Sequence, residues 1–273
     1  MAIQDDTMKI IAVSNHKGGC GKTTTAVNLA AALAERGNSV LLLDMDSQGH
    51  ATLGVGVNPY ELQRSLYDLL VREQTGWEEV ILRTRYPHLD LVPSNVLLSG
   101  AEGEIMGWPE RESVLRRRLE RLAGGYAYCL IDCSPSLSLL TINALAAGTE
   151  LLIPIQTQYY AVEGLKQLLE TVQIIRERFN PDLKILGLLL TFVESRTKLS
   201  HDIEQQMRNY FGELVFDTVI RKTVRLAEAP SMGEPIQVYA PDCTGAEDYR
   251  QLAEEIEYGK AKIRTAQADL VNI

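Results

Sequence analysis

A glycine-rich run that holds two lysines is the strongest chemical signal in the chain. Its residues are Lys17, Gly18, Gly19, Cys20, Gly21, Lys22, Thr23 and Thr24, and it follows an apolar segment and opens a helical one. Glycines let backbone N–H groups approach phosphate oxygens, and a helix N-terminus adds the positive end of its dipole. In such a loop the second lysine reaches the β- and γ-phosphates, and the hydroxyl after it faces Mg²⁺. The run therefore predicts a phosphate-binding loop in which Lys22 and Thr23 have these roles.

Three aspartates at the ends of apolar segments are candidates for the magnesium shell. Asp44 ends one such segment, Asp46 follows it closely, and Asp132 ends another. Acidic residues at the carboxyl ends of neighbouring strands lie where a metal ion and an attacking water must be placed. We assign Thr23, Asp44 and Asp132 to Mg²⁺. Helix capping is the alternative explanation for the first two aspartates.

The elements that must position these residues alternate along the chain. Short apolar runs at 9–14, 39–44, 89–93, 127–132, 150–155 and 184–192 predict buried strands, whereas 22–36, 161–179 and 200–211 predict helices. Near-continuous apolar strands between helices are typical of a parallel sheet covered on both faces. The fold class expected is α/β, with a doubly wound, mostly parallel sheet and helices on both faces. The region 72–110 is the least patterned.

Length and composition favour one large globular domain over 1–273. The chain has 273 residues, of which 45% are hydrophobic and 23% charged, which excludes collagen-like, mainly disordered and coiled-coil chains. The four cysteines are too sparse for a disulfide scaffold, and no apolar run has the length of a membrane span. The first residues lack the pattern of a signal peptide. We expect reduced thiols and a cytoplasmic location.

The charge balance excludes a generally basic coat for nucleic acid but leaves room for a local patch. The net charge is −9, yet the segment 221–225 holds Arg221, Lys222 and Arg225 and no acid. A second basic run, Arg111 to Arg121, holds five arginines and two glutamates at helical spacing. We interpret this second run as a solvated helix face.

The phosphate loop departs from the standard pattern in a way that points to one family. His16 stands where the standard loop has its first glycine, and Lys17 follows it. The run resembles the deviant loop KGGxGKT of the ParA/MinD family of ATPases. Residues 44–52 are similar to that family's D-x-D-x-Q-G-x-A-T, and residues 154–164 to its P-x-Q-x-E-Y-Y-A-x-E-G, with Gln158 in place of Glu. Together with residues 224–231, the resemblance covers about 8–257, leaves a short tail and favours the ParA/Soj partition ATPases.

This resemblance implies a magnesium-dependent ATPase that acts as a homodimer. In the family the additional lysine, here Lys17, crosses the dimer interface to the partner's nucleotide, and the second aspartate of the acidic motif, here Asp46, orients the attacking water. The catalytic set would be Lys17, Lys22 and Asp46. Family members place the loop that matches 220–223 beside adenine. Arg221 and Lys222 are therefore assigned to ATP, although this loop departs from the family's Ile-Pro-Arg-Asn.

The resemblance also implies function and partners. Partition ATPases bind double-stranded DNA without sequence preference as ATP dimers, and the segments concerned match Arg196 and Arg225, with Lys222 nearby. A ParB-like protein on the cargo would stimulate slow hydrolysis, so we expect a nucleoid-associated DNA-segregation or cargo-positioning ATPase.

Two other functions stay open at this stage. A MinD-like membrane-cycling ATPase needs a basic amphipathic C-terminal helix, whereas the tail 260–273 has a weak apolar face and no aromatic residue. A metabolic enzyme of the same superfamily would be a reductase iron protein or an ATP-dependent synthetase. The iron protein needs exposed cluster cysteines, whereas Cys129 falls inside a predicted strand and Cys133 directly after Asp132.

Overall fold

The computed structural model describes residues 8–158, 161–194 and 196–259. The predicted tail 260–273 and the two tyrosines of the motif at 154–164 lie outside the described residues.

Seven strands form one sheet in the order β3-β4-β2-β5-β1-β6-β7. Every neighbouring pair is parallel except β3 with β4, which is antiparallel. The strands are β1 (Lys9–Val13), β2 (Val40–Met45), β3 (Leu82–Arg83), β4 (Leu89–Val92), β5 (Tyr128–Cys133), β6 (Glu150–Gln156) and β7 (Lys184–Thr191). The predicted α/β class with a mostly parallel sheet is confirmed.

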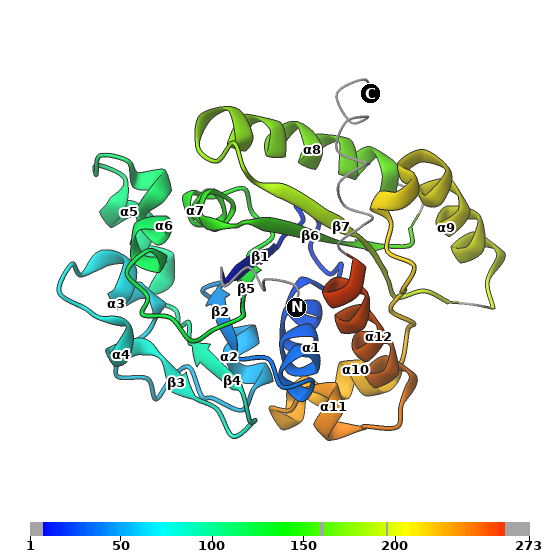
Figure 1. Ribbon diagram of the computed structural model, residues 1–273, viewed down its shortest axis with the longest axis horizontal. Coiled ribbons are helices and arrows are strands. Elements are labelled where there is room, and N and C mark those ends of the chain that lie inside the picture. Colours follow the sequence, from blue (N-terminus) through cyan, green and yellow to red (C-terminus); the bar gives the residue numbers. More distant parts are fainter. Residues whose placement is uncertain (1–7, 159–160, 195, 260–273) are drawn as a thin grey trace, which may run out of the picture.

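Helices cover both faces of this sheet, which explains why its strands are apolar throughout. One buried cluster joins the sheet to α7, α8 and α9, and the other joins its opposite face to α1 and α12. Figure 1 shows α7 and α8 above the sheet and α1, α11 and α12 below it. Strands buried on both faces need no polar alternation, so they appear in the sequence as continuous Val, Leu and Ile runs.

The helices have the following bounds: α1 (Lys22–Glu35), α2 (His50–Gly54), α3 (Leu66–Val71), α4 (Trp77–Val80), α5 (Leu98–Ile105), α6 (Val114–Leu119), α7 (Leu139–Ala147), α8 (Ala161–Arg178), α9 (Lys198–Phe211), α10 (Val224–Glu228), α11 (Ile236–Tyr239) and α12 (Thr244–Tyr258). The region 72–110, which lacked a pattern, contains α4, β3, β4 and α5. These elements are mostly too short for a helical or alternating period to emerge.

The interpretation of the Arg111–Arg121 run as a solvated helix face is wrong for Arg118, which is buried, and holds in part for Arg111, Arg116 and Arg117, which are half-exposed. Only Arg121 among the five is exposed. Arg118 is 9% exposed, and its guanidinium donates to the backbone carbonyls of Arg72 at 2.8 Å and Glu73 at 3.0 Å. These carbonyls follow the end of α3, where helical carbonyls lack partners, so Arg118 serves to satisfy buried backbone.

None of the helices in the described part of the chain combines the length and the apolar character that crossing a bilayer requires.

Candidate functional site

The phosphate loop joins β1 to α1 and leaves backbone donors free. Gly19 and Gly21 have φ of +71° and +88°, a left-handed conformation that glycine adopts without strain. Gly21 is the N-cap of α1, and no side chain accepts a hydrogen bond from the first turn. The first N–H groups of a helix have no partner inside the helix. This loop can therefore bind phosphate oxygens through its backbone.

Lys22 adds a positive charge at the floor of the loop. Its side chain is buried, and its Nζ donates to the backbone carbonyl of Lys17 at 2.9 Å. Within the described residues no carboxylate lies within ion-pair distance of this ammonium group. A buried cation without an anion is costly unless a ligand supplies the charge. Burial and the nearby Lys22 charge lower the pKa of His16, which keeps that imidazole neutral beside the loop.

Asp44 and Asp132 lie side by side because β2 and β5 are paired in that register. Both are completely buried, but their surroundings differ. The carboxylate of Asp44 accepts hydrogen bonds from the N–H of Thr52 at 2.8 Å and its hydroxyl at 2.7 Å, and from the N–H of Asp46 at 3.1 Å. Neither oxygen of Asp132 accepts a hydrogen bond from a described residue.

This difference makes Asp132 a better candidate than Asp44 for the magnesium shell. Burial raises the pKa of Asp44 to about 6, against the hydrogen bonds from Thr52 and Asp46, which lower it. Burial and the charge of Asp44 raise the pKa of Asp132, while Thr23 and Lys22 oppose that rise. An orphaned buried carboxylate beside the Thr23 hydroxyl fits the water shell of Mg²⁺. The oxygens of Asp44 are already engaged, so its assignment to the metal stays a prediction.

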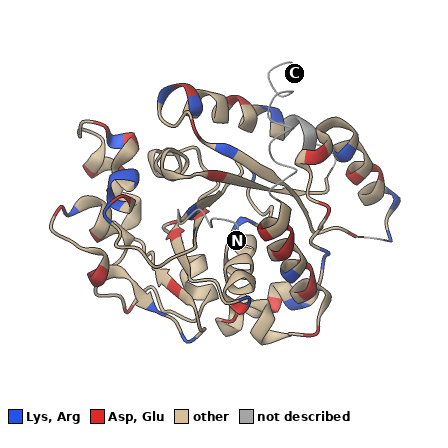
Figure 2. Ribbon diagram, viewed as in Figure 1, with Lys and Arg blue, Asp and Glu red and all other residues tan. Residues whose placement is uncertain are grey.

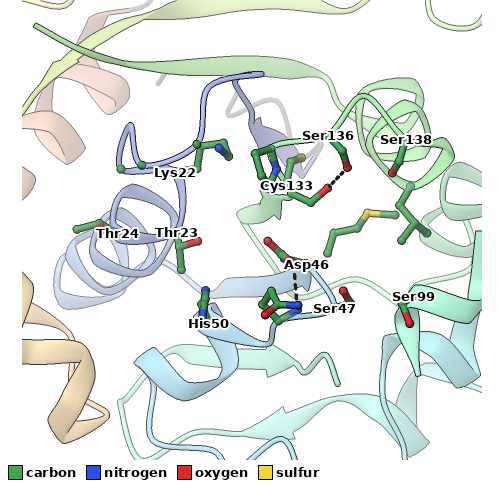
Figure 3. Close-up of a pocket in the computed structure, with 18 of the residues that line it drawn as sticks. Lys22, Thr23, Thr24, Asp46, Ser47, His50, Ser99, Cys133, Ser136 and Ser138 are labelled. Atoms are coloured by element: carbon green, nitrogen blue, oxygen red, sulfur yellow. Dashed lines mark hydrogen bonds between the residues drawn. The ribbon is translucent and has the colours of Figure 1, made fainter. Parts of the chain in front are cut away.

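A cavity of about 670 Å³ lies between the phosphate loop and the segments that follow β2 and β5. Figure 3 shows Lys22 and Thr23 on one side, Asp46 from the end of β2 in the middle, and Cys133 and Ser136 across from them. The Asp46 carboxylate accepts the N–H of Gln48 at 3.0 Å, which closes a tight turn at the cavity wall. The volume is within the usual range for a cofactor or nucleotide pocket.

Several lining residues were not predicted from the sequence. Ser99 and Glu102 come from α5, and Glu102 also accepts the N–H of Leu140 at 3.1 Å, at the start of α7. In the segment after Asp132, the hydroxyls of Ser134 and Ser136 form a hydrogen bond of 3.1 Å at the cavity. Only tertiary packing brings α5 here, so no local pattern could have revealed it.

Phe192 is the most unusual of the unpredicted lining residues. It follows β7, has φ of +52° and lies 3.5 Å from the position that a Cβ on Gly21 would take. A non-glycine residue in this conformation is strained and tends to occur at functional sites. The neighbouring Thr191 hydroxyl donates to the carbonyl of Cys20 at 2.8 Å, which fixes the end of β7 to the phosphate loop. Cys20 itself is buried and is not among the residues that line the cavity, and its Sγ is directed at the Lys17 carbonyl.

Lys17 points away from the nucleotide cavity of its own chain. Its side chain is exposed, it is not among the residues that line the cavity, and its Nζ donates to Gln158 Oε1 at 2.6 Å. The two lysines of the loop are thus in different places: Lys22 on the floor and Lys17 at the rim.

The residues predicted for adenine and DNA contacts do not line the cavity. Arg221 pairs with Asp248, with Nε 2.9 Å from Oδ1, and Lys222 pairs with Glu194 at 2.5 Å. Arg225 pairs with Glu228 at 3.0 Å. Arg196 is exposed, and no carboxylate of the described chain forms an ion pair with it. The segment 221–225 lacks acids in the sequence but not in space, and its assignments to ATP and DNA stay predictions.

The site has the features of a P-loop nucleotide-binding protein. These are a glycine loop between a strand and a helix, a buried lysine, and carboxylates at the ends of adjacent parallel strands. Comparison with known proteins narrows this class. The AAA domain family matches residues 8–185. The chain is 47% identical over 248 residues to the sporulation initiation inhibitor protein Soj of Bacillus subtilis, an alignment that covers 91% of this chain and 98% of Soj. It is 44% identical to the chromosome partitioning protein ParA of Myxococcus xanthus, over 91% of this chain and 87% of that protein.

The chain therefore belongs to the ParA/MinD family of ATPases and is of the ParA/Soj type. Among solved structures, the cobyrinic acid a,c-diamide synthase of Mycobacterium smegmatis with bound ATP analogue and magnesium is similar to it. The TM-score is 0.82 and the identity 34%, over 92% of this chain and 94% of that one.

Proposed function

We propose that the chain is a DNA-segregation or cargo-positioning ATPase whose ATP-bound dimer binds DNA without sequence preference. ATP and Mg²⁺ occupy the cavity between the phosphate loop and Asp46, and hydrolysis returns the dimer to monomers that leave DNA. A cargo-bound, ParB-like partner stimulates this slow hydrolysis, and the protein is cytoplasmic and associated with the nucleoid. The two partition relatives, each aligned over most of its length, support this proposal.

The position of Lys17 is the observation that best supports an ATP-bound dimer. Lys22 already supplies a cation to the cavity, whereas the Lys17 ammonium lies at the exposed rim, held by a neutral amide. An exposed lysine loses little on leaving a hydrogen bond to a neutral partner, because water replaces that bond. Lys17 is therefore free to reach the phosphates of a second subunit that closes over the cavity.

Different residues in and beside the cavity have different roles in hydrolysis. The backbone of the loop and Lys22 hold the phosphates, and Asp46, at the cavity wall, orients the attacking water. Thr23 and Asp132 would hold Mg²⁺, which when bound offsets the negative charge on the phosphates. Asp44 fixes the backbone of Asp46 through the hydrogen bond from its N–H, so it positions the catalytic carboxylate.

The DNA step is tested with Arg196→Glu combined with Arg225→Glu. Both side chains are exposed, so the change should leave the fold and ATP dimerisation intact. Gel shifts on two unrelated duplexes, with a slowly hydrolysed ATP analogue and several salt concentrations, should show equal binding of both by the wild type. The variant should bind neither duplex, or bind with a salt slope smaller by about 0.9 for each phosphate that it no longer neutralises. A strong preference for one duplex would contradict binding without sequence preference. Undiminished binding by the variant would contradict the assignment of Arg196 and Arg225 to the DNA contact.

A synthetase is the second candidate, favoured by the likeness to the diamide synthase. The identity is lower than with the partition proteins, 34% against 47%. The two functions differ in what ATP turnover requires. A positioning ATPase hydrolyses ATP alone and faster with DNA and its partner, whereas a synthetase needs a carboxylic acid and a nitrogen donor. ATP consumption that DNA leaves unchanged and that needs such an acceptor would favour the synthetase.

A further inference from the structure

Each cation of the basic segment 221–225 has a carboxylate partner from elsewhere in the chain or one helical turn on. Arg221 pairs with Asp248 of α12, Lys222 with Glu194 after β7, and Arg225 with Glu228 in α10. In Figure 2 most of the charged positions along α12, the helix that supplies Asp248, are acidic. The formal charge of the three pairs is zero, which is unfavourable for a surface that binds a polyanion.

The three pairs differ in how easily they open. Asp248 is buried with a side chain 3% exposed, and it also accepts the backbone N–H of Arg221 at 2.8 Å, so this pair is part of the framework. The other two are exposed, with side-chain exposures of 61% for Lys222 and 45% for Glu194. For Arg225 and Glu228 they are 58% and 41%, and Glu228 also accepts from the Tyr239 hydroxyl at 3.1 Å. Exposed pairs contribute about 0–1 kcal/mol, so a phosphate group can displace their carboxylates.

Glu194 is also connected to the nucleotide cavity. It lies two residues after the cavity-lining Phe192, in a segment that the Thr191 hydroxyl ties to the phosphate loop. Between them Val193 bridges to the basic segment: its N–H donates to the Ile220 carbonyl and its carbonyl accepts the N–H of Lys222, both at 3.0 Å. A ligand that contacts the strained Phe192 therefore acts on the segment that bears Glu194 and, through the two hydrogen bonds of Val193, on the basic segment.

We propose that Glu194 and Glu228 mask the DNA-binding cations of the nucleotide-free protein. This inference rests on the proposed function, because it assumes that the ATP dimer binds DNA through this face. The two glutamates neutralise Lys222 and Arg225 until nucleotide shifts the segment that bears Glu194 and DNA phosphates replace the carboxylates. The masking weakens the binding of the ATP-free monomer to DNA.

The test replaces the masking carboxylates with the isosteric amide. Glu194→Gln, Glu228→Gln and the double variant are compared with the wild type by fluorescence anisotropy on a random duplex. The measurements use several salt concentrations, without nucleotide and with the ATP analogue. Without nucleotide, the double variant should bind about threefold or more tightly, with a salt slope steeper by about 0.9 for each cation freed. With the analogue the gain should be smaller, because the pairs are already open.

Glu35→Gln is the matched control. Glu35 has the same side-chain exposure as Glu194, 45%, and pairs with Arg250 at 2.8 Å outside the basic segment. It changes the net charge by the same amount as each single variant and should leave DNA binding unchanged. An equal gain in DNA affinity in this control would show a general effect of charge and would contradict the masking proposal. If the wild type binds DNA with the analogue but the Glu194 and Glu228 variants bind no better without nucleotide, the masking is wrong and the proposed function stands. If no form binds DNA, both are wrong.

Discussion

The Nζ of Lys17 lies 2.6 Å from Oε1 of Gln158, so the additional lysine of the phosphate loop is bound to a residue just after β6. The family pattern has a glutamate where this chain has Gln158. A carboxylate there would add an opposite charge and turn the hydrogen bond from the Lys17 ammonium to a neutral amide into an ion pair. The amide therefore makes release of Lys17 easier than a glutamate would.

Changes at this contact should affect dimerisation and not nucleotide binding. Lys17→Ala should bind ATP as a monomer but fail to dimerise, because it lacks the ammonium proposed to reach the partner's phosphates. Gln158→Glu should weaken dimerisation by holding Lys17 in its own subunit. Size-exclusion chromatography with the ATP analogue measures both effects. Lys184→Ala, which removes an exposed lysine at the start of β7, is the control. A normal dimer from Lys17→Ala would refute the cross-subunit role.

Lys22→Ala should act one step earlier, on nucleotide binding itself. The change removes the buried ammonium from the floor of the loop. Charge-assisted hydrogen bonds contribute about 1.5–3 kcal/mol each, so ATP affinity should fall about 10- to 100-fold or more. Isothermal titration calorimetry with Mg-ATP gives the dissociation constant, and Lys17→Ala should keep the wild-type value in the monomer. An unchanged affinity in Lys22→Ala would remove the residue from the phosphate site.

Asp46→Asn should separate hydrolysis from binding. The amide oxygen can still accept the Gln48 N–H, so the turn at the cavity wall is kept while the charge is removed. The carboxylate is proposed to act on water in the transition state, and such a change lowers the rate without weakening ground-state binding. Turnover should fall about 10²- to 10⁴-fold, with ATP affinity and dimerisation retained. A variant that turns over like the wild type would exclude Asp46 from the mechanism.

The sequence was informative wherever structure and chemistry are local. Six of the strands and the phosphate loop follow from continuous apolar runs and glycines. The proximity of Asp44 and Asp132 could be predicted because both end parallel strands at the same edge of the sheet. Cys129 and Cys133 are buried, as their place on a central strand implied.

What the sequence could not reveal depends on distant partners. The segment 221–225 looked uniformly basic because Glu194 and Asp248, which pair with two of its cations, are distant from it in the sequence. Arg118 looked solvated because the carbonyls that bind it belong to another helix end. Phe192 carries no local signal of its positive φ, which the junction of β7 with the phosphate loop imposes.

The orphaned carboxylate of Asp132 should make the nucleotide-free protein less stable than it could be. Its pKa is raised in the folded state, so the folded protein holds a proton that the unfolded chain releases at lower pH. The wild type should therefore lose stability as the pH rises from the unfolded value of about 4 through the raised folded value. Asp132→Asn carries no titrating group here and avoids that loss.

Asp132→Asn should accordingly raise the melting temperature of the nucleotide-free protein at pH 8, by about 2–4 °C for each kcal/mol gained. The gain should shrink toward pH 5.5, because the wild-type carboxyl is then increasingly protonated. With Mg-ATP the order should reverse, since a ligand that binds only the folded state stabilises the wild type more than a variant lacking a metal partner. Thermal scans at pH 5.5, 7 and 8, with and without Mg-ATP, measure all three effects. Glu35→Gln is the control, because it removes a carboxylate that is paired with Arg250 and does not line the cavity. A lower melting temperature for Asp132→Asn at pH 8 without nucleotide would mean that the carboxylate stabilises the fold and is not kept free for a metal ion.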